Sequence, residues 1–179
     1  MSNSSDFLTT KVENALADLG AIRTLAKDRQ LPTFDDAEEL AIAQTDASGK
    51  PHFLIPAAAS AWKELKSDAA REGCQMHILS AFRGFDRQVK VVRTALAAGR
   101  SLDEIFQSIA PPGCSEHHSG RALDVGTVGC KDLSEAFEQT AAFDWLAHRA
   151  AQYGFGLSFP RNNKWGYTYE PWHWCFTCD

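Results

Sequence analysis

Two short motifs constrain this chain more than any other part of its sequence. The first is SEHHSGRALDVG at residues 115–126, and the second is EPWHW at residues 170–174. The end of the first motif alternates in polarity, and successive side chains of a β-strand point to opposite faces. Leu123 and Val125 should therefore pack into a core, while Asp124 faces a cleft.

The spacing of the motifs can bring two histidines beside this aspartate. His117 precedes Asp124 in the first motif, and Gly120 between them permits a turn that returns the imidazole towards the carboxylate. In the second motif Pro171 cannot donate a ladder hydrogen bond, so it should mark the start of a strand. His173 would then face the same cleft from this strand.

Two imidazoles and one carboxylate are a ligand set of the kind that holds a catalytic zinc ion. Such a site keeps three protein ligands, here His117, Asp124 and His173, and leaves a fourth position for water. Glu170 would be the carboxylate that stays off the metal and serves as general acid and base. A single histidine is more often structural, so this interpretation depends on the whole set. His118 should point away from His117 and is expected at the rim or behind the ligands.

The combined pattern resembles a known family. SxHxxGxAxD followed later in the chain by ExWH is similar to the motifs of the zinc D-alanyl-D-alanine carboxypeptidases of the VanY type and of the related L,D-carboxypeptidases, which trim bacterial cell-wall stem peptides. The resemblance covers roughly residues 54–176. It implies one Zn²⁺ ion on His117, Asp124 and His173, with Glu170 as the catalytic glutamate.

A third segment extends the resemblance to substrate-binding residues. The family's SxYRSxxxQ segment corresponds to SAFRGFDRQ, in which Arg83 and Gln88 match, whereas Phe82 and Gly84 replace the usual Tyr and Ser. The match implies that Arg83 binds the substrate near the scissile bond or at its terminal carboxylate, a role that suits the planar guanidinium. It also implies that Gln88 orients the peptide and that Ser115 contacts the carboxylate end.

The expected reaction is hydrolysis of the last peptide bond of a peptidoglycan-derived tetrapeptide or pentapeptide, which releases D-alanine. The sequence leaves open whether the bond is of the D,D or the L,D type. One alternative is an endopeptidase of the phage-lysin type, for which a separate wall-binding module would be expected. The other is a non-catalytic zinc-binding module on the hedgehog-like scaffold, and the presence of Glu170 argues against it.

Composition agrees with one compact domain over residues 1–179, made of an N-terminal helical extension (1–35) and the family-like core (54–176). The chain has 179 residues, of which 44% are hydrophobic and 23% charged. A net charge of -5 argues against a nucleic-acid partner, whose binding surface would be basic. No apolar run reaches the roughly 20 residues of a transmembrane helix, so no membrane anchor is expected. The oligomeric state is not predicted.

The cellular compartment is predicted from the N-terminus and the cysteines. The chain begins MSNSSDF, which lacks the basic start and apolar core of an export signal. The number of cysteines, five, is odd and favours reduced thiols. We therefore expect a cytoplasmic protein, or a periplasmic one if a signal has been removed. Cys175 and Cys178 form a CxxC, for which a redox or structural-zinc role is a minor alternative.

The remaining pattern predicts an α+β fold in which helices flank a small, mainly antiparallel sheet. The family resemblance implies the same architecture, the fold that the D,D-peptidases share with the hedgehog signalling domain. Helical periodicity and capping signals predict helices over residues 6–27, 57–71, 86–98, 101–110 and 134–153. Alternation and turn signals predict strands over residues 39–45, 52–55, 75–80, 155–159 and 172–176.

Overall fold

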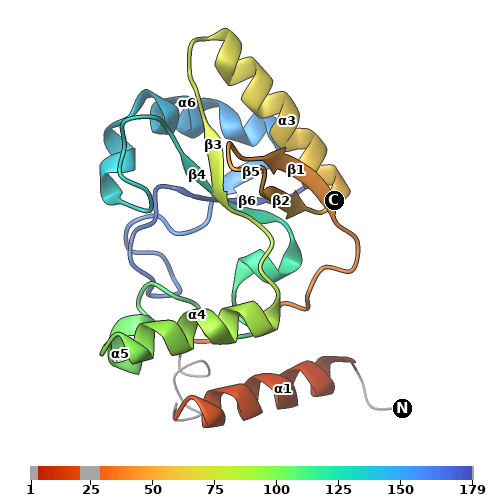
Figure 1. Ribbon diagram of the computed structural model, residues 1–179, viewed down its shortest axis with the longest axis vertical. Coiled ribbons are helices and arrows are strands. Elements are labelled where there is room, and N and C mark those ends of the chain that lie inside the picture. Colours follow the sequence, from red (N-terminus) through yellow and green to blue (C-terminus); the bar gives the residue numbers. More distant parts are fainter. Residues whose placement is uncertain (1–3, 21–28, 179) are drawn as a thin grey trace.

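The computed structural model describes residues 4–20 and 29–178. Figure 1 shows the sheet in the middle of the molecule, with α3 and α6 packed on one side and α4, α5 and α1 forming a separate layer beyond the other end of the strands. The bounds of the helices are α1 (Ser4–Asp18), α3 (Pro56–Arg71), α4 (Phe85–Ala97), α5 (Leu102–Ile105) and α6 (Ala141–Arg149). Three short 3-10 helices are η1 (Glu116–Ser119), η2 (Glu135–Gln139) and η3 (Ala150–Tyr153).

The strands form one four-stranded sheet and one hairpin, and every pairing in them is antiparallel. The order in the sheet is β3-β4-β6-β5. The bounds are β3 (His77–Ser80), β4 (Ala122–Gly126), β6 (His173–Phe176) and β5 (Phe155–Leu157), and the hairpin consists of β1 (Ala41–Thr45) and β2 (Pro51–Leu54). These pairings confirm the predicted α+β class with its mainly antiparallel sheet.

The sequence also predicted the hairpin and the helix after it. The Asp46 carboxylate accepts hydrogen bonds from the N–H groups of Ser48 and Lys50, and Gly49 takes a positive φ of 86°. Such an Asx turn supplies the tight reversal between the two strands. Helix α3 follows with a proline in its first turn, where the missing N–H costs no hydrogen bond.

Two hydrophobic clusters hold these layers together. The larger one lies between the sheet and helices α3 and α6, and it includes Leu123 and Val125 of β4, as their alternation predicted. The smaller one joins α1, α4 and α5 through residues such as Val12, Val92 and Phe106. Fully burying one such side chain stabilises the fold by about 1.5–3 kcal/mol. The two clusters are separate, and the functional residues described below lie between them.

The predicted helix over residues 134–153 is wrong as a single element. The chain instead forms η2, α6 and η3 in succession. Thr140 has an extended backbone, with φ -100° and ψ 152°, and its hydroxyl caps the new helix by accepting a hydrogen bond from the N–H of Phe143. An N-cap residue has non-helical dihedral angles, so a helix cannot continue through Thr140. The apolar periodicity of the sequence shows no break at this position and therefore did not reveal the cap.

The helix predicted to open at Ser101 is much shorter than expected. Its capping box with Glu104 is present, but α5 ends at Ile105. The next two carbonyls are used in tertiary contacts, since that of Phe106 accepts from Arg29 and that of Gln107 accepts from the N–H of Thr168. These contacts replace the hydrogen bonds that a longer helix would make.

The N-terminal helix was predicted over residues 6–27. In the structure α1 ends at Asp18, and Gly20 has a positive φ of 76°. Positions 21–27 of the prediction lie outside the described residues. Within the described ranges, no helix is both long and apolar enough to span a bilayer.

Candidate metal centre and active site

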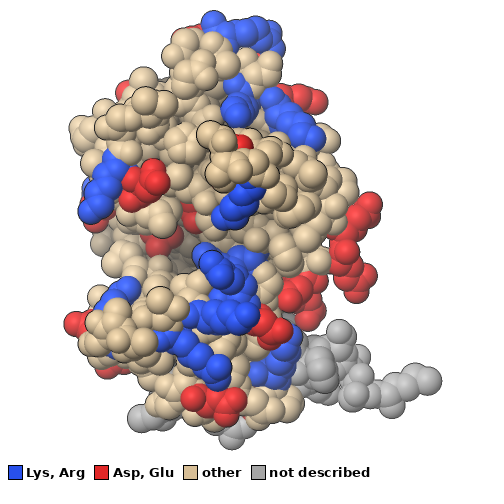
Figure 2. Space-filling view, viewed as in Figure 1, with Lys and Arg blue, Asp and Glu red and all other residues tan. Residues whose placement is uncertain are grey.

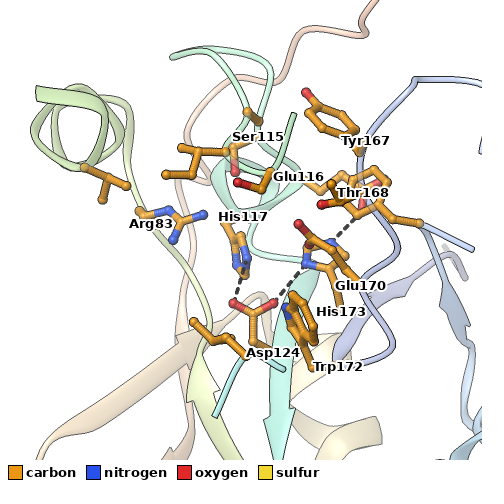
Figure 3. A pocket seen from close by; sticks show the side chains of 16 residues that line it. Arg83, Ser115, Glu116, His117, Asp124, Tyr167, Thr168, Glu170, Trp172 and His173 are labelled. Atoms are coloured by element: carbon orange, nitrogen blue, oxygen red, sulfur yellow. Dashed lines mark hydrogen bonds and ion pairs between the residues drawn. The ribbon is translucent and has the colours of Figure 1, made fainter. Parts of the chain in front are cut away.

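Three side chains from three different elements meet at one end of the sheet (Figure 3). His117 comes from η1, Asp124 from β4 and His173 from β6, and one potential ligand atom from each lies within 4.8 Å of the others. Nε2 of His117 lies 3.3 Å from Oδ2 of Asp124, and Nδ1 of His173 lies 3.0 Å from Oδ1 of the same carboxylate. The set that the sequence assigned to the metal is therefore brought together.

Local backbone structure explains this convergence. Asp124 and His173 are direct partners in the antiparallel register of β4 and β6, so their side chains project from the same face of the sheet. His117 is turned towards them by Gly120, which ends η1 with a φ of 66°. A Cβ at Gly120 would lie 3.1 Å from side-chain atoms of Ala37, Leu40 and Ile55, so this turn needs glycine for both conformation and space.

The second nitrogen of each imidazole is held by a protein oxygen. His117 Nδ1 lies 2.8 Å from the carbonyl oxygen of Ala81, and His173 Nε2 lies 3.0 Å from Oε2 of Glu116. Each ring thus directs one nitrogen at Asp124 and the other at an acceptor, which is the arrangement found around metal-bound histidines. The donor set of two nitrogens and one carboxylate fits a zinc ion.

The electrostatics of the cluster also favour a cation. Burial opposes the charged form of Asp124, but His117 and His173 outweigh it and hold the pKa of Asp124 well below its ordinary value. Burial likewise opposes the charged form of His173, yet its hydrogen bonds to Asp124 and Glu116 raise its pKa to about 10. The buried carboxylate of Asp124 therefore attracts positive charge to the Nδ1 side of this ring, where a metal ion can take the place of a proton.

The three side chains open into a cavity of about 350 Å³ between the sheet and the α4–α5 layer. In Figure 2 it is the hollow at the left of the molecule, with acidic atoms inside it and basic side chains gathered over α4 beside it. The residues that line it are Arg83, Val91, Ser108, Ile109, Ala110, Ser115, Glu116, His117, Asp124, Leu133, Phe159, Tyr167, Thr168, Glu170, Trp172 and His173.

Glu170 enters this cavity from the loop before β6, as the sequence predicted. Its side chain is buried, with 8% of the residue exposed, and it is not one of the three residues that share the potential metal position. Burial raises the pKa of Glu170 to about 7, against the opposing effect of His173. A carboxyl group with a pKa near neutrality can both accept and release a proton, as general acid–base catalysis requires.

Two of the three predicted substrate-binding residues also line the cavity. Ser115 is buried at its wall. The guanidinium of Arg83 faces the metal cluster, and its buried Nε has no hydrogen-bond partner within the described residues. An N–H group of this kind is costly to bury unless a ligand can accept its hydrogen bond.

Gln88 and His118 both lie outside the set of residues that line the cavity. Gln88 is fully buried outside the cavity lining, where its Nε2 donates to the carbonyl of Ala110, a residue that does line the cavity. His118 is also fully buried and is not a rim residue, because the segment forms η1 and is not extended. Its Nδ1 lies 2.6 Å from the carbonyl oxygen of Arg83, and its Nε2 accepts from the N–H of Gly113.

Sequence reasoning missed several residues of the site. Glu116 was passed over, although it stands next to a predicted ligand, because an acidic residue beside a histidine is most often solvated. The aromatic residues Phe159, Tyr167 and Trp172 line the cavity, and the ring centroid of Phe159 lies 4.8 Å from that of His173. They lie on the loop after β5 and just before β6, where no periodic pattern marks a cavity wall.

Comparison with known families identifies the chain. The family model described as VanY, D-alanyl-D-alanine carboxypeptidase, matches residues 51–179. The chain belongs to this family. The match includes both metal-site motifs and the segment around Arg83, and it leaves α1 outside.

Individual relatives agree with this assignment. The chain is 34% identical over 124 residues to YodJ of Bacillus subtilis (strain 168), a match that covers 68% of this chain and 45% of that protein. It is 31% identical over 126 residues to the bifunctional D-Ala-D-Ala dipeptidase and D-Ala-D-Ala carboxypeptidase VanXYC of Enterococcus gallinarum, covering 68% of this chain and 65% of the relative. The chain thus spans about half to two thirds of the length of these relatives.

Solved structures show the same fold. The L,D-carboxypeptidase LdcB superposes with a TM-score of 0.70 at 30% identity, over 81% of this chain and 71% of that one. A VanYB complex with D-alanine-D-alanine superposes with a TM-score of 0.61 at 24% identity, over 81% of this chain and 80% of that one, and it supports the fold alone.

Proposed function

We propose that this protein is a zinc carboxypeptidase that hydrolyses the terminal peptide bond of peptidoglycan stem peptides and releases D-alanine. One observation carries the proposal. His117, Asp124 and His173 converge on one point of a cavity that also contains a separate buried carboxylate, Glu170, and an arginine with an unsatisfied N–H group, Arg83. The names of the relatives, which describe carboxypeptidases acting on D-Ala-D-Ala, support the substrate class.

One zinc ion held by the three ligands would supply Lewis acidity to the scissile carbonyl and to the attacking water. Glu170 accepts the proton of that water as its oxygen adds to the carbonyl carbon. When the C–N bond breaks, Glu170 passes the proton to the amine nitrogen of the departing D-alanine. Its buried position keeps the carboxyl group ready for both transfers, because burial brings its pKa near 7.

Arg83 is placed to orient the substrate in the site. Its guanidinium carries a fixed positive charge and several donors, which suit a carboxylate or a developing oxyanion. We propose that it binds the terminal carboxylate of the substrate or the oxygen of the scissile carbonyl, with Ser115 beside it. Gln88 would then act indirectly, since it holds the Ala110 carbonyl at the cavity wall.

We further propose the cytoplasm as the working compartment, where the substrates would be stem peptides recovered from the wall or carried by precursors. The acidic net charge and the five cysteines, none of them in a disulfide, support this proposal. Locating the untagged full-length protein by cell fractionation would test it, and recovery with periplasmic markers would contradict it.

The decisive experiment compares Glu170→Gln with the wild-type protein. The variant should retain one zinc ion per chain but lose turnover of stem peptides by several orders of magnitude. The other described carboxylates that line the cavity are already engaged, Asp124 as a metal ligand and Glu116 with His173. Zinc content by atomic absorption and product mass separate the two effects. Glu135→Gln, an exposed residue whose charge pairs with Arg161, is the matched control and should retain activity.

The same assay defines the bond that is cut. Wild-type protein incubated with matched tetrapeptides and pentapeptides should release D-alanine from at least one of them. Normal turnover by Glu170→Gln, or release only of internal fragments, would contradict the proposal.

A further inference from the structure

We propose that Glu116 is a positioning residue for the metal centre: it accepts the Nε2–H of His173 and thereby presents Nδ1 of this ring to the metal. The inference rests on the proposed zinc site but not on the identity of the substrate. It assigns a role to a half-buried acidic residue that the catalytic mechanism above does not use.

The geometry around His173 distinguishes its two nitrogens. Nδ1 lies 3.0 Å from Oδ1 of Asp124, and the other oxygen of that carboxylate lies 3.3 Å from the ligand nitrogen of His117. Nε2 lies on the opposite edge of the ring, 3.0 Å from Oε2 of Glu116. A neutral imidazole carries its proton on one nitrogen only. An acceptor at Nε2 therefore keeps the proton there and leaves the Nδ1 lone pair facing the metal position.

Glu116 can hold this position because its own carboxylate is fixed. Its Oε2 lies 3.0 Å from Nε2 of His173, and the side chains of Ser158 and Cys175 lie beside the same carboxylate. Only 18% of its side chain is exposed. Cys175 projects from β6 on the same face as His173, as the alternation of the strand predicts. Three contacts from two segments thus define the orientation of one acidic group.

The position of Glu116 in the chain couples the two histidine ligands. It directly precedes His117 at the start of η1, so the same short turn supplies one ligand and the group that orients the other. The two rings differ in their outer acceptors, since Nδ1 of His117 faces the neutral carbonyl of Ala81. A charged acceptor makes the histidine that it binds a stronger metal ligand than a neutral acceptor does. Loss of Glu116 should therefore weaken the His173 bond to the metal in particular.

Two other roles of Glu116 predict different results. As a residue of the cavity wall it could bind a cationic group of the substrate, and removing it would then raise KM without changing zinc affinity. As a direct metal ligand it would change the coordination number of the bound ion when replaced. The experiment is chosen to distinguish these roles, and it does not depend on peptide turnover.

The first measurement is zinc affinity by competition with a chromophoric chelator, for wild-type, Glu116→Ala and Glu116→Gln proteins. We expect Glu116→Ala to weaken zinc binding by about 10- to 100-fold, and Glu116→Gln to weaken it less, because the amide oxygen can still accept the Nε2–H. Glu64→Ala, an exposed glutamate of α3, is the matched control and should bind zinc as the wild type does. The visible spectrum of cobalt-substituted protein should retain the wild-type coordination number in both variants.

Three outcomes would overturn the inference. They are an unchanged zinc affinity of Glu116→Ala, a change confined to KM, and a loss of one ligand in the cobalt spectrum. If Glu116→Ala fails to fold, the zinc-loaded wild-type protein still provides a test, because two-bond ¹⁵N–¹H NMR correlations report which imidazole nitrogen carries the proton. We expect Nε2–H for His173, and Nδ1–H would refute the proposal.

Different experimental results would contradict the role of Glu116 and the proposed function. If the wild type binds zinc but cleaves no stem peptide, the proposed function falls while the role of Glu116 remains. If stem peptides are cleaved and Glu116→Ala keeps full zinc affinity, only the role of Glu116 falls.

Discussion

Nε2 of His117 and Oδ2 of Asp124 lie 3.3 Å apart, although one residue belongs to a 3-10 helix and the other to the central strand that follows it. Both side chains are almost completely buried. Two buried polar groups that face the same potential metal position are suited to bind one cation together.

Removal of the metal should destabilise the protein as well as inactivate it. Because zinc binds the folded chain, a concentration of free zinc 100 times its dissociation constant would add about 2.7 kcal/mol to the free energy of unfolding. Thermal unfolding with and without a chelator measures the effect. Added zinc should restore both stability and activity. An equal melting temperature in the two conditions would contradict the metal site.

Gly120→Ala should damage the metal centre, and Gly129→Ala should not. Both glycines have positive φ, 66° and 83°, so each substitution should cost about 1–2 kcal/mol of stability through backbone strain. Only Gly120 is crowded, with three side chains 3.1 Å from the position of the new Cβ. Zinc titrations of both variants should therefore show weaker binding for Gly120→Ala alone, because the turn that orients His117 must shift.

Arg29→Ala should loosen the loop that carries Glu170. Nε of Arg29 donates to the carbonyl of Trp165 at 2.7 Å, and its guanidinium lies 4.3 Å from the ring centroid of Tyr167. Loss of a hydrogen bond from a charged group should cost about 1.5–3 kcal/mol. Hydrogen exchange should speed up in residues 163–168, and kcat should fall while zinc affinity is retained.

The control for this loop is Arg149→Ala, which removes an exposed ion pair with Glu72 and should cost at most about 1 kcal/mol. Equal hydrogen exchange of residues 163–168 in Arg29→Ala and wild type would contradict the anchoring role.

The free energy of unfolding should decrease as the pH is lowered, and His52 should account for part of this decrease. Burial lowers the pKa of this residue below its ordinary value of 6.5, and the nearby carboxylate of Asp46 opposes the shift only in part. The folded state therefore binds the proton less readily than the unfolded chain. The contribution of His52 to the free energy of unfolding is fully present above pH 6.5. It is lost as the pH falls through 6.5 towards the lower pKa of the folded state.

The measurement for His52 is a pair of melting curves at about pH 7.5 and about pH 5.5, on either side of the ordinary histidine pKa. His52→Gln removes the titrating group, so the variant should lose less stability between the two conditions than the wild type does. Equal losses would show that His52 does not contribute.

The site could be predicted from the sequence because its residues are chemically distinctive. Imidazole and carboxylate groups at the spacing of His117, Asp124 and His173 have few other uses, and the alternation around Asp124 gave the orientation of the strand. Glu116 has the same chemistry as any surface glutamate, and only its contact with His173 distinguishes it. Contacts between distant segments, such as Arg29 with Trp165, leave no local pattern at all.

The fold was predicted where one local signal dominated. The hairpin around Asp46 and helix α3 both appeared as expected, because their turn and capping residues agree with the hydrophobic pattern. At Thr140 the two signals conflict, and the side-chain cap prevails over helical periodicity. Similarly, the capping box at Ser101 predicts where α5 begins, whereas tertiary contacts decide where it ends.

The pairing of β4 with β6 places His173 opposite Asp124 and Trp174 opposite Leu123. Sliding one strand past the other by a single residue would turn the indole into the cavity and the imidazole into the apolar core. A misaligned chain could then offer no complete cage for a divalent ion. Binding of a divalent ion would therefore stabilise the correctly aligned strands over the misaligned ones.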